Sequence, residues 1–298
     1  MKKLLFTGAS GFLGNNILPI LKKTYDVHTI GLTDEDDIKI NIAKEVPCLG
    51  EQFDVVLHAA GKAHTVPRTE EEKQVFYDVN YIGTIHLCDA LEKVGAPKSI
   101  VFISTVAVYG CESGELIDEK HPLNGNSPYA DSKKLAEKYL SNWCKDRDVK
   151  LTILRPSLLA GHNAPGNLGS MVEGIKKGRY LNISGGKVCK SILMAEDIAR
   201  LLPLAENKSG IYNVCDSYQP TFGELSVSVA KQLGKREPLS IPYWMAWCMA
   251  KVGDLLGSKA PINSYKLRKM TESLTFSNEK AKRELSWEPL DVLTNYKI

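Results

Sequence analysis

The chain has 298 residues, and its 38 Lys and Arg against 35 Asp and Glu leave a formal charge of +3 at pH 7. This balance argues against nucleic acid as a partner, and 43% hydrophobic with 24% charged residues excludes a disordered or fibrous chain. No run of about 18 apolar residues predicts a membrane span. The seven dispersed cysteines predict free thiols, no metal site and a cytoplasmic location.

Short β-branched runs alternate with longer amphipathic stretches through the first half of the chain. This alternation predicts βαβ units around a buried parallel sheet. The candidate strands lie at residues 3–7, 27–31, 55–59, 100–104 and 151–154, with helical patterns at 13–23, 70–94 and 129–145. We therefore expect an α/β protein with a Rossmann-like, doubly wound parallel sheet and a smaller, discontinuous C-terminal substrate lobe.

Beyond residue 155 the pattern is less regular and richer in Gly, Asn and Pro. Two strand-like pieces, 191–194 and 211–214, are expected to return to the sheet. The predicted division is a nucleotide-binding domain over 1–165, with strand returns near 188–218, and a substrate lobe over 166–187 and 219–298.

One apolar stretch, 241–257, resembles a membrane segment at first sight. It is interrupted by Pro242, Lys251 and Asp254. We interpret it as a core-packing helix, with a membrane-surface segment as the alternative.

A glycine-rich turn, TGASGFLG, follows the first candidate strand directly. Gly8 suits the tight turn, Gly11 lets the backbone approach a pyrophosphate, and Gly14 lets the next helix lie close to the sheet. The positive end of that helix then faces the phosphates. The turn sits between a strand and a helix, as dinucleotide binding requires, and so it predicts a phosphate site rather than an ordinary turn.

An acidic run, TDEDD, follows the second candidate strand and contains Asp34, Glu35, Asp36 and Asp37. These acids repel a 2′-phosphate, and no Arg lies between the glycine turn and this run. The pattern favours NAD over NADP, which stays open, and Asp34 is the expected ribose contact. A solvated loop accounts equally well for any single one of these acids.

Tyr129 and Lys133 share one face of a predicted helix, because they are four residues apart. Ser127 suits the N-cap and Pro128 the first helical position, which places Tyr129 at the positive helix end. A nearby ammonium, a cationic nicotinamide and that helix end should together lower the phenol's pKa from about 10, so that Tyr129 can exchange a proton near neutral pH.

Thr105 stands at the carboxyl end of a central candidate strand, where ligands bind in open α/β sheets. It could hydrogen-bond the same reacting oxygen as Tyr129. Ser104 has the same chemistry, but strand alternation puts the two hydroxyls on opposite faces, so only one can serve.

These motifs occur in a familiar order: TGASGFLG, HAAG at 58–61, Asn80 in DVNYIGT, STVAVYG, Tyr129-x-x-x-Lys133 and LRPS at 154–157. The ordered set resembles the nucleotide-sugar epimerase/dehydratase group of extended short-chain dehydrogenases/reductases. The resemblance covers nearly the whole chain, because FSNEKAKRELSWEPL is similar to that family's closing segment.

The resemblance implies cofactor contacts as well as chemistry. Tyr129, Lys133 and Thr105 would be catalytic, Tyr129 and Lys133 would also contact the cofactor, and Asn80 would hold backbone at the sheet end. The other implied cofactor residues are Phe12 and Leu13 at the pyrophosphate, Asn41 and Ile42 at the adenine, and Ala59, Ala60 and Gly61 along the cleft.

The group includes dehydratases, whose members place an Asp–Glu pair after the Thr. Val106 and Ala107 stand there in this chain and cannot exchange protons. The resemblance thus implies hydride transfer at a sugar carbon, C4, of a nucleotide-activated sugar, by a reductase or a 4-epimerase. Asn167 and Lys190 match its substrate-loop and diphosphate positions, although turn chemistry and a solvated cation explain them equally well.

Other readings stay open. A non-catalytic dinucleotide sensor or scaffold is one, and a reductase of a non-sugar carbonyl is another. The sugar could be lipid-linked, and the helical stretches could form a homodimer interface or monomer surface.

Overall fold

A seven-stranded sheet forms the centre of the computed structural model, which describes residues 1–63, 65–256 and 262–298. The strand order is β11-β7-β5-β4-β1-β2-β3, and all the pairings are parallel. The order reverses at β1, so the chain leaves β1 and β4 in opposite directions and opens a crevice there. The strands are β1 (Lys3–Thr7), β2 (Asp26–Gly31), β3 (Ile38–Lys39), β4 (Val55–His58), β5 (Ser99–Ile103), β7 (Lys150–Pro156) and β11 (Gly210–Val214). The predicted Rossmann-like sheet is confirmed.

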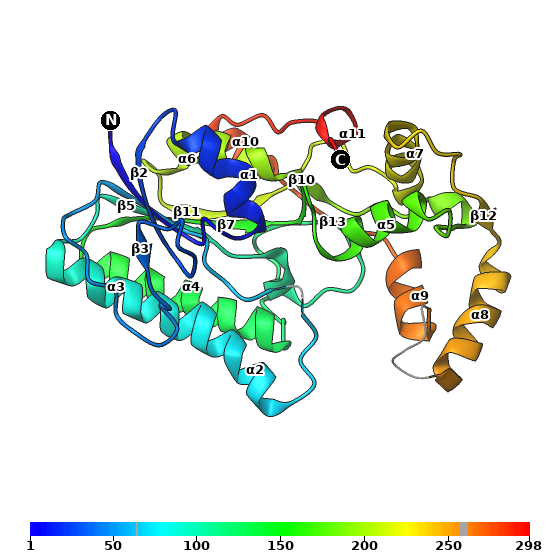
Figure 1. Cartoon of the computed structure of the whole chain (residues 1–298), viewed down its shortest axis with the longest axis horizontal. Coiled ribbons are helices and arrows are strands. Elements are labelled where there is room, and N and C mark those ends of the chain that lie inside the picture. The colour runs from blue at the N-terminus through cyan, green and yellow to red at the C-terminus, as the bar shows by residue number, and fades with distance from the viewer. Residues whose placement is uncertain (64, 257–261) are drawn as a thin grey trace.

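Helices cover both faces of the sheet (Figure 1). Alternation along β1 sends Leu4 and Phe6 into one apolar core and Leu5 into the other. The first core is closed by α1 (Phe12–Leu21), α6 (Ala195–Ala205) and α10 (Glu279–Leu285), and the second by α3 (Gly83–Val94) and α4 (Pro128–Asp146), with α2 (Glu70–Tyr77) beside α4.

The helical stretch predicted over 70–94 has the expected extent but is interrupted. A π-helical turn, Asp78–Ile82, separates α2 from α3. Hydrophobic periodicity does not reveal such a turn, which is a local widening often found at functional sites.

In the described part of the chain, three two-stranded parallel sheets flank the main one. They pair β8 (Leu158–Ala160) with β10 (Ile192–Met194), β9 (Asn182–Ile183) with β12 (Ser240–Ile241), and β6 (Gly114–Ile117) with β13 (Leu274–Phe276). The piece at 211–214 does return to the main sheet, as β11. The expectation for 191–194 is wrong, because β10 pairs with β8 instead. A short apolar run indicates a strand but not its partner.

The remaining helices lie beyond the seven-stranded sheet, to the right in Figure 1. These are α5 (Gly166–Lys176), α7 (Phe222–Gln232), α8 (Tyr243–Leu256), α9 (Ser264–Thr271) and α11 (Val292–Asn295). Residues of α5, α7 and α11 share an apolar cluster of their own. The domain boundaries drawn from the sequence stay a prediction.

We expected the stretch 241–257 to pack into the core, and for residues 241–256 this is wrong. Residue 257 lies outside the residues that the structure describes. Of α8, Ala246, Ala250 and Gly253 are buried. Its large side chains point outward, with Trp244 65% and Leu255 88% exposed. Apolar composition alone does not show which face of a helix is covered.

Candidate active site

The glycine turn has the geometry that its sequence predicts. Gly8 has φ +84°, and a Cβ there would lie 2.7 Å from the Ala60 nitrogen. A Cβ on Gly14 would lie 2.1 Å from the Ala9 carbonyl oxygen, so this position lets α1 approach the strand end. Gly11 is the N-cap of α1. The positive end of α1 therefore opens on the crevice beside β1.

A cavity of about 540 Å³ occupies this crevice. It lies where the strand order reverses, the usual position of ligands in open α/β sheets. Many of the predicted site residues line it: Gly8, Gly11, Phe12, Leu13, Ala59, Gly61, Thr105, Tyr129 and Lys133.

Tyr129 enters the cavity from the first turn of α4. Ser127 caps this helix by accepting a hydrogen bond from the Ala130 amide (3.2 Å), and Pro128 follows the cap. Burial raises the pKa of the Tyr129 phenol, while its hydrogen bond with Thr105 acts in the opposite direction. Among the protein's own groups burial therefore outweighs the groups that lower this pKa, and the lowering expected with a bound cationic nicotinamide stays a prediction.

The two neighbouring hydroxyls at the end of β5 have different partners. Thr105 hydrogen-bonds with Tyr129, and its Oγ1 accepts from the Ala107 amide at 3.1 Å. Ser104 donates to the buried Glu137 carboxylate. The choice of Thr105 as the hydroxyl beside Tyr129 thus agrees with the geometry.

Lys133 lies one helical turn below Tyr129 and is only 3% exposed. Its Nζ donates to the Ile103 carbonyl at 2.9 Å and lies 4.7 Å from the centre of the Phe102 ring. Burial lowers the pKa of Lys133 to about 8, and the Glu137 charge opposes this shift. A Cβ on Gly61 would lie 3.1 Å from this Nζ and 3.1 Å from Asn80 Oδ1, so a larger residue there would crowd both side chains.

The lowered pKa of Lys133 predicts a specific pH dependence of stability. Between pH 8 and the unfolded value near 10.5 the unfolded chain binds the additional proton, so the free energy of unfolding should rise with pH through this window. Urea unfolding of the wild type and of Lys133→Met at pH 7.5 and pH 10 tests this. The wild type should gain up to about 3 kcal/mol relative to the variant over that interval. A constant difference would contradict the prediction.

Asn80 holds backbone at the sheet end, as the resemblance implies. It sits in the π-helical turn and is fully buried. Its Oδ1 accepts from the Lys62 amide at 2.7 Å, and its Nδ2 donates to Ser132 at 2.9 Å. This ties the chain after β4 to α4 and so supports the wall that carries Lys133.

Sequence reasoning missed a buried charge network beneath the site. Arg155 donates to Glu137 through Nε (3.0 Å) and Nη2 (2.6 Å), and through Nη1 to the Tyr109 hydroxyl (3.0 Å). The Tyr109 hydroxyl in turn donates to Asn213 at 2.7 Å. A usable signal was Glu137 itself, since it lies four residues after Lys133 on the same helix face.

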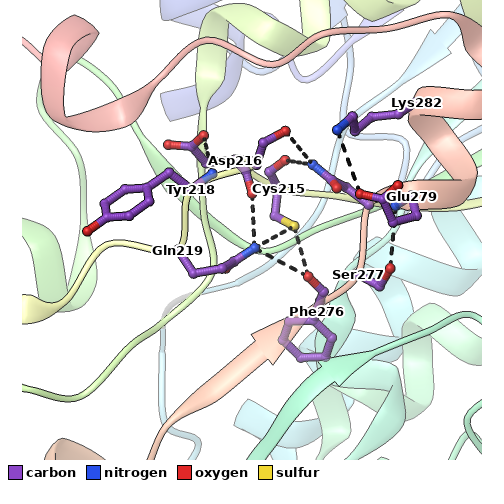
Figure 2. A network of polar contacts seen from close by, with 10 residues as sticks. Cys215, Asp216, Tyr218, Gln219, Phe276, Ser277, Glu279 and Lys282 are labelled. Atoms are coloured by element: carbon purple, nitrogen blue, oxygen red, sulfur yellow. Dashed lines mark hydrogen bonds and ion pairs between the residues drawn. The ribbon is translucent and has the colours of Figure 1, made fainter.

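The far wall of the cavity comes from the C-terminal part of the chain. Leu274 and Phe276 of β13 line it. Figure 2 shows how polar contacts hold this strand against the end of β11: the Cys215 thiol donates to the Phe276 carbonyl at 3.2 Å, and Gln219 Nε2 donates to the same carbonyl at 3.4 Å. Two segments that lie 61 residues apart in the chain thereby form one wall of the cavity.

Cys111 also lines the cavity and was not expected there. Its sulfur lies 3.2 Å from His121 Nε2, and burial raises the pKa of the thiol. Nothing in the spacing of these two residues marked them beforehand.

Several predicted residues do not line the cavity. Asp34 is 90% exposed and pairs with Lys39. Asn41 accepts a hydrogen bond from the Ala43 amide, and Ile42 is part of the apolar core. Ala60 packs against Gly8, and Gly14 packs against Ala9.

The two predicted substrate residues do not line the cavity either. Asn167 is exposed on the first turn of α5. The backbone of Lys190 forms an isolated β-bridge with that of Leu274.

No helix among residues 1–63, 65–256 and 262–298 is both long and apolar enough to cross a bilayer. The same residues contain no group of three or more His, Cys, Asp or Glu side chains placed to hold a metal ion.

A Rossmann-like sheet with a glycine turn and a Tyr-x-x-x-Lys helix at its crevice defines the extended short-chain dehydrogenase/reductase class. The chain belongs to the NAD dependent epimerase/dehydratase family, whose sequence model matches residues 4–215.

Individual relatives are distant but cover the chain well. The N-acetyl-alpha-D-glucosaminyl-diphospho-ditrans,octacis-undecaprenol 4-epimerase of Escherichia coli O157:H7 is 28% identical over 93% of this chain and 88% of its own. The structure of the UDP-glucose 4-epimerase of Thermotoga maritima with UDP-glucose has a TM-score of 0.75 at 21% identity, covering 99% of this chain and 96% of that one. RMD from Pseudomonas aeruginosa complexed with NADPH has a TM-score of 0.75 at 20% identity, with the same coverage.

Proposed function

We propose that this protein is an NAD(P)-dependent oxidoreductase that transfers hydride at a sugar carbon, C4, of a nucleotide-activated sugar, as a 4-keto-sugar reductase or a 4-epimerase. The observation that carries the proposal is that Thr105, Tyr129 and Lys133 line one cavity together with the glycine turn. Family membership and the 4-epimerase named among the relatives support it.

The chain's residues divide the chemistry among them. A bound nicotinamide supplies or accepts the hydride. Tyr129 gives its proton to the oxygen at the reacting carbon, and Thr105 orients that oxygen by hydrogen bonding. The Lys133 ammonium contacts the ribose and stabilises negative charge at the phenol after proton transfer. Val106 and Ala107 also line the cavity and carry no group able to exchange a proton, which argues against a dehydratase.

The first proton transfer at Tyr129 differs between a reductase and an epimerase. A protonated phenol is ready to donate, as reduction of a ketone requires, whereas an epimerase must also begin by taking a proton from a hydroxyl. Native mass spectrometry of the purified protein separates the two, since an epimerase keeps its NAD through turnover and a reductase exchanges it. NADH consumption with a 4-keto nucleotide sugar then tests the reductase directly. Dinucleotide binding without turnover of any 4-keto or 4-hydroxy sugar would favour a sensor, and no dinucleotide binding would overturn the proposal.

The geometry at the end of β2 supports Asp36 as the proposed contact to the cofactor ribose. A Cβ on Gly31 would lie 2.3 Å from Asp36 Oδ2, so this carboxylate lies directly against the strand end. Its Oδ2 accepts from the Thr33 amide (3.0 Å) and hydroxyl (2.7 Å), and these bonds hold the carboxylate at this position. We therefore assign the ribose contact predicted for Asp34 to Asp36, because Asp34 points to solvent and pairs with Lys39.

Replacing Asp36 with alanine should weaken NADH binding about tenfold or more, which is the value of one hydrogen bond to a charged group. The same change should reduce the preference of the protein for NADH over NADPH. Asp34→Ala is the matched control and should leave both dissociation constants nearly unchanged. Fluorescence titration of both variants with NADH and NADPH is the measurement. Equal losses in the two variants, or a loss only in Asp34→Ala, would refute the assignment.

A further inference from the structure

The helix α8 presents its apolar side chains in the reverse of the usual arrangement. Its buried face consists of the small residues Ala246, Ala250 and Gly253, which turn toward α9 and a small cluster that includes Leu267. The opposite face, at helical spacing, exposes Trp244, Cys248, Val252 and Leu255. A helix that only needed to pack would bury its large side chains and expose its small ones.

This exposed surface is concentrated at one place. Both Trp side chains that are exposed in this chain belong to α8, Trp244 at 65% and Trp247 at 47%, whereas Trp143 and Trp287 are buried. Met245 and Met249 are exposed beside them. In Figure 1, α8 and α9 form one end of the molecule, away from the seven-stranded sheet.

Basic side chains lie beside the apolar face. Lys251 lies 5.6 Å from the centre of the Trp247 ring, and Lys269 lies 4.4 Å from that of Tyr265. Helix α9 carries Lys266, Arg268 and Lys269 and no acidic residue between its ends. Arg268 pairs with Glu112 and Lys251 lies 3.9 Å from Asp254, so the two helices together are still net cationic. Aromatic rings next to long basic side chains are the composition of helices that lie in the headgroup region of anionic bilayers.

We propose that α8 and α9 dock the protein on an anionic lipid bilayer, with Trp244, Val252 and Leu255 inserted among the headgroups and the cations of both helices against lipid phosphates. Charge complementarity favours a bilayer over a second copy of this chain, because an identical copy would bring the same cations together. Docking holds β13, which follows α9 and lines the cavity, close to the membrane. The proposal does not depend on which reaction the cavity performs.

Vesicle flotation tests it with the full chain. We expect binding to phosphatidylcholine–phosphatidylglycerol vesicles, weaker binding to pure phosphatidylcholine, and weakening of the former by high salt. The combined variant Trp244→Ser, Val252→Ser and Leu255→Ser should lower the partition coefficient at least tenfold. The matched control, Val66→Ser, Leu116→Ser and Leu204→Ser, removes apolar side chains that are also exposed but lie elsewhere, and should bind as the wild type does.

Tryptophan fluorescence of the wild type gives a readout that needs no variant. Vesicles should shift the emission to the blue, and brominated lipids should quench it, because the two exposed tryptophans are both on α8. No flotation and no quenching would overturn the proposal. A blue shift that grows with protein concentration in the absence of lipid, together with dimers that the triple variant abolishes, would also overturn it and assign the face to a second copy.

Discussion

Replacing Tyr129 with phenylalanine is expected to lower kcat by a factor of about 10²–10⁴, the usual contribution of a positioned proton donor. The ring and its packing stay, and only the hydroxyl that hydrogen-bonds with Thr105 is lost. Binding of the dinucleotide should weaken at most about fivefold, the value of one ordinary hydrogen bond. Steady-state kinetics with a 4-keto nucleotide sugar and titration with NADH measure the two effects separately.

Tyr77→Phe is the matched control for this experiment. Tyr77 lies on α2, and its hydroxyl donates to Asp131 at 3.1 Å, so this variant also removes a phenolic hydrogen bond next to α4. It should retain the kcat of the wild type. If Tyr129→Phe turned over at the wild-type rate, the assignment of Tyr129 as proton donor would be wrong.

The second large effect concerns stability. Replacing Glu137 with alanine leaves the Arg155 guanidinium, only 2% exposed, without its charge partner. Breaking such a buried pair costs about 3–5 kcal/mol, because the remaining ion is neither hydrated nor neutralised. The loss also removes the negative charge that raises the pKa of Lys133. Urea unfolding should therefore show a large loss of stability, with the pKa of Lys133 lowered further.

Two further variants identify the cause. Glu173→Ala removes a carboxylate that pairs with Lys176 and Lys177 on the surface, and should change stability far less. The double variant Glu137→Leu with Arg155→Met replaces the buried pair by apolar groups and should recover most of the stability lost in Glu137→Ala. A double variant as unstable as the single one would show that packing, rather than the unpaired charge, was responsible.

The local chemistry of the site was predictable because it depends on short spacings. The glycines of TGASGFLG are dictated by one turn and one helix start, and Gly8 and Gly14 show the close approaches that exclude a Cβ. Tyr129 and Lys133 share a helix face for a similarly local reason. Thr105 could be placed at a strand end because β5 is a clear apolar run.

Contacts between distant segments were not predictable in this way. Spacing could not show that Asp36 rather than Asp34 turns back on Gly31, since both belong to one acidic loop. It also could not reveal Arg155 beneath Glu137, Cys111 beside His121, or the pairing of β10 with β8. Each depends on how separate elements pack, and many sequences of similar pattern pack differently.

The sequence by itself determined the doubly wound sheet and the glycine turn, and it predicted Thr105, Tyr129 and Lys133, which the fold brings to one cavity. Their signals are periodicity and backbone sterics, which act within a few residues. Only the tertiary structure decided the direction of the Tyr129 pKa, the lowered pKa of Lys133 and the outward face of α8. These are consequences of burial, and burial is decided by what the rest of the chain places around a residue.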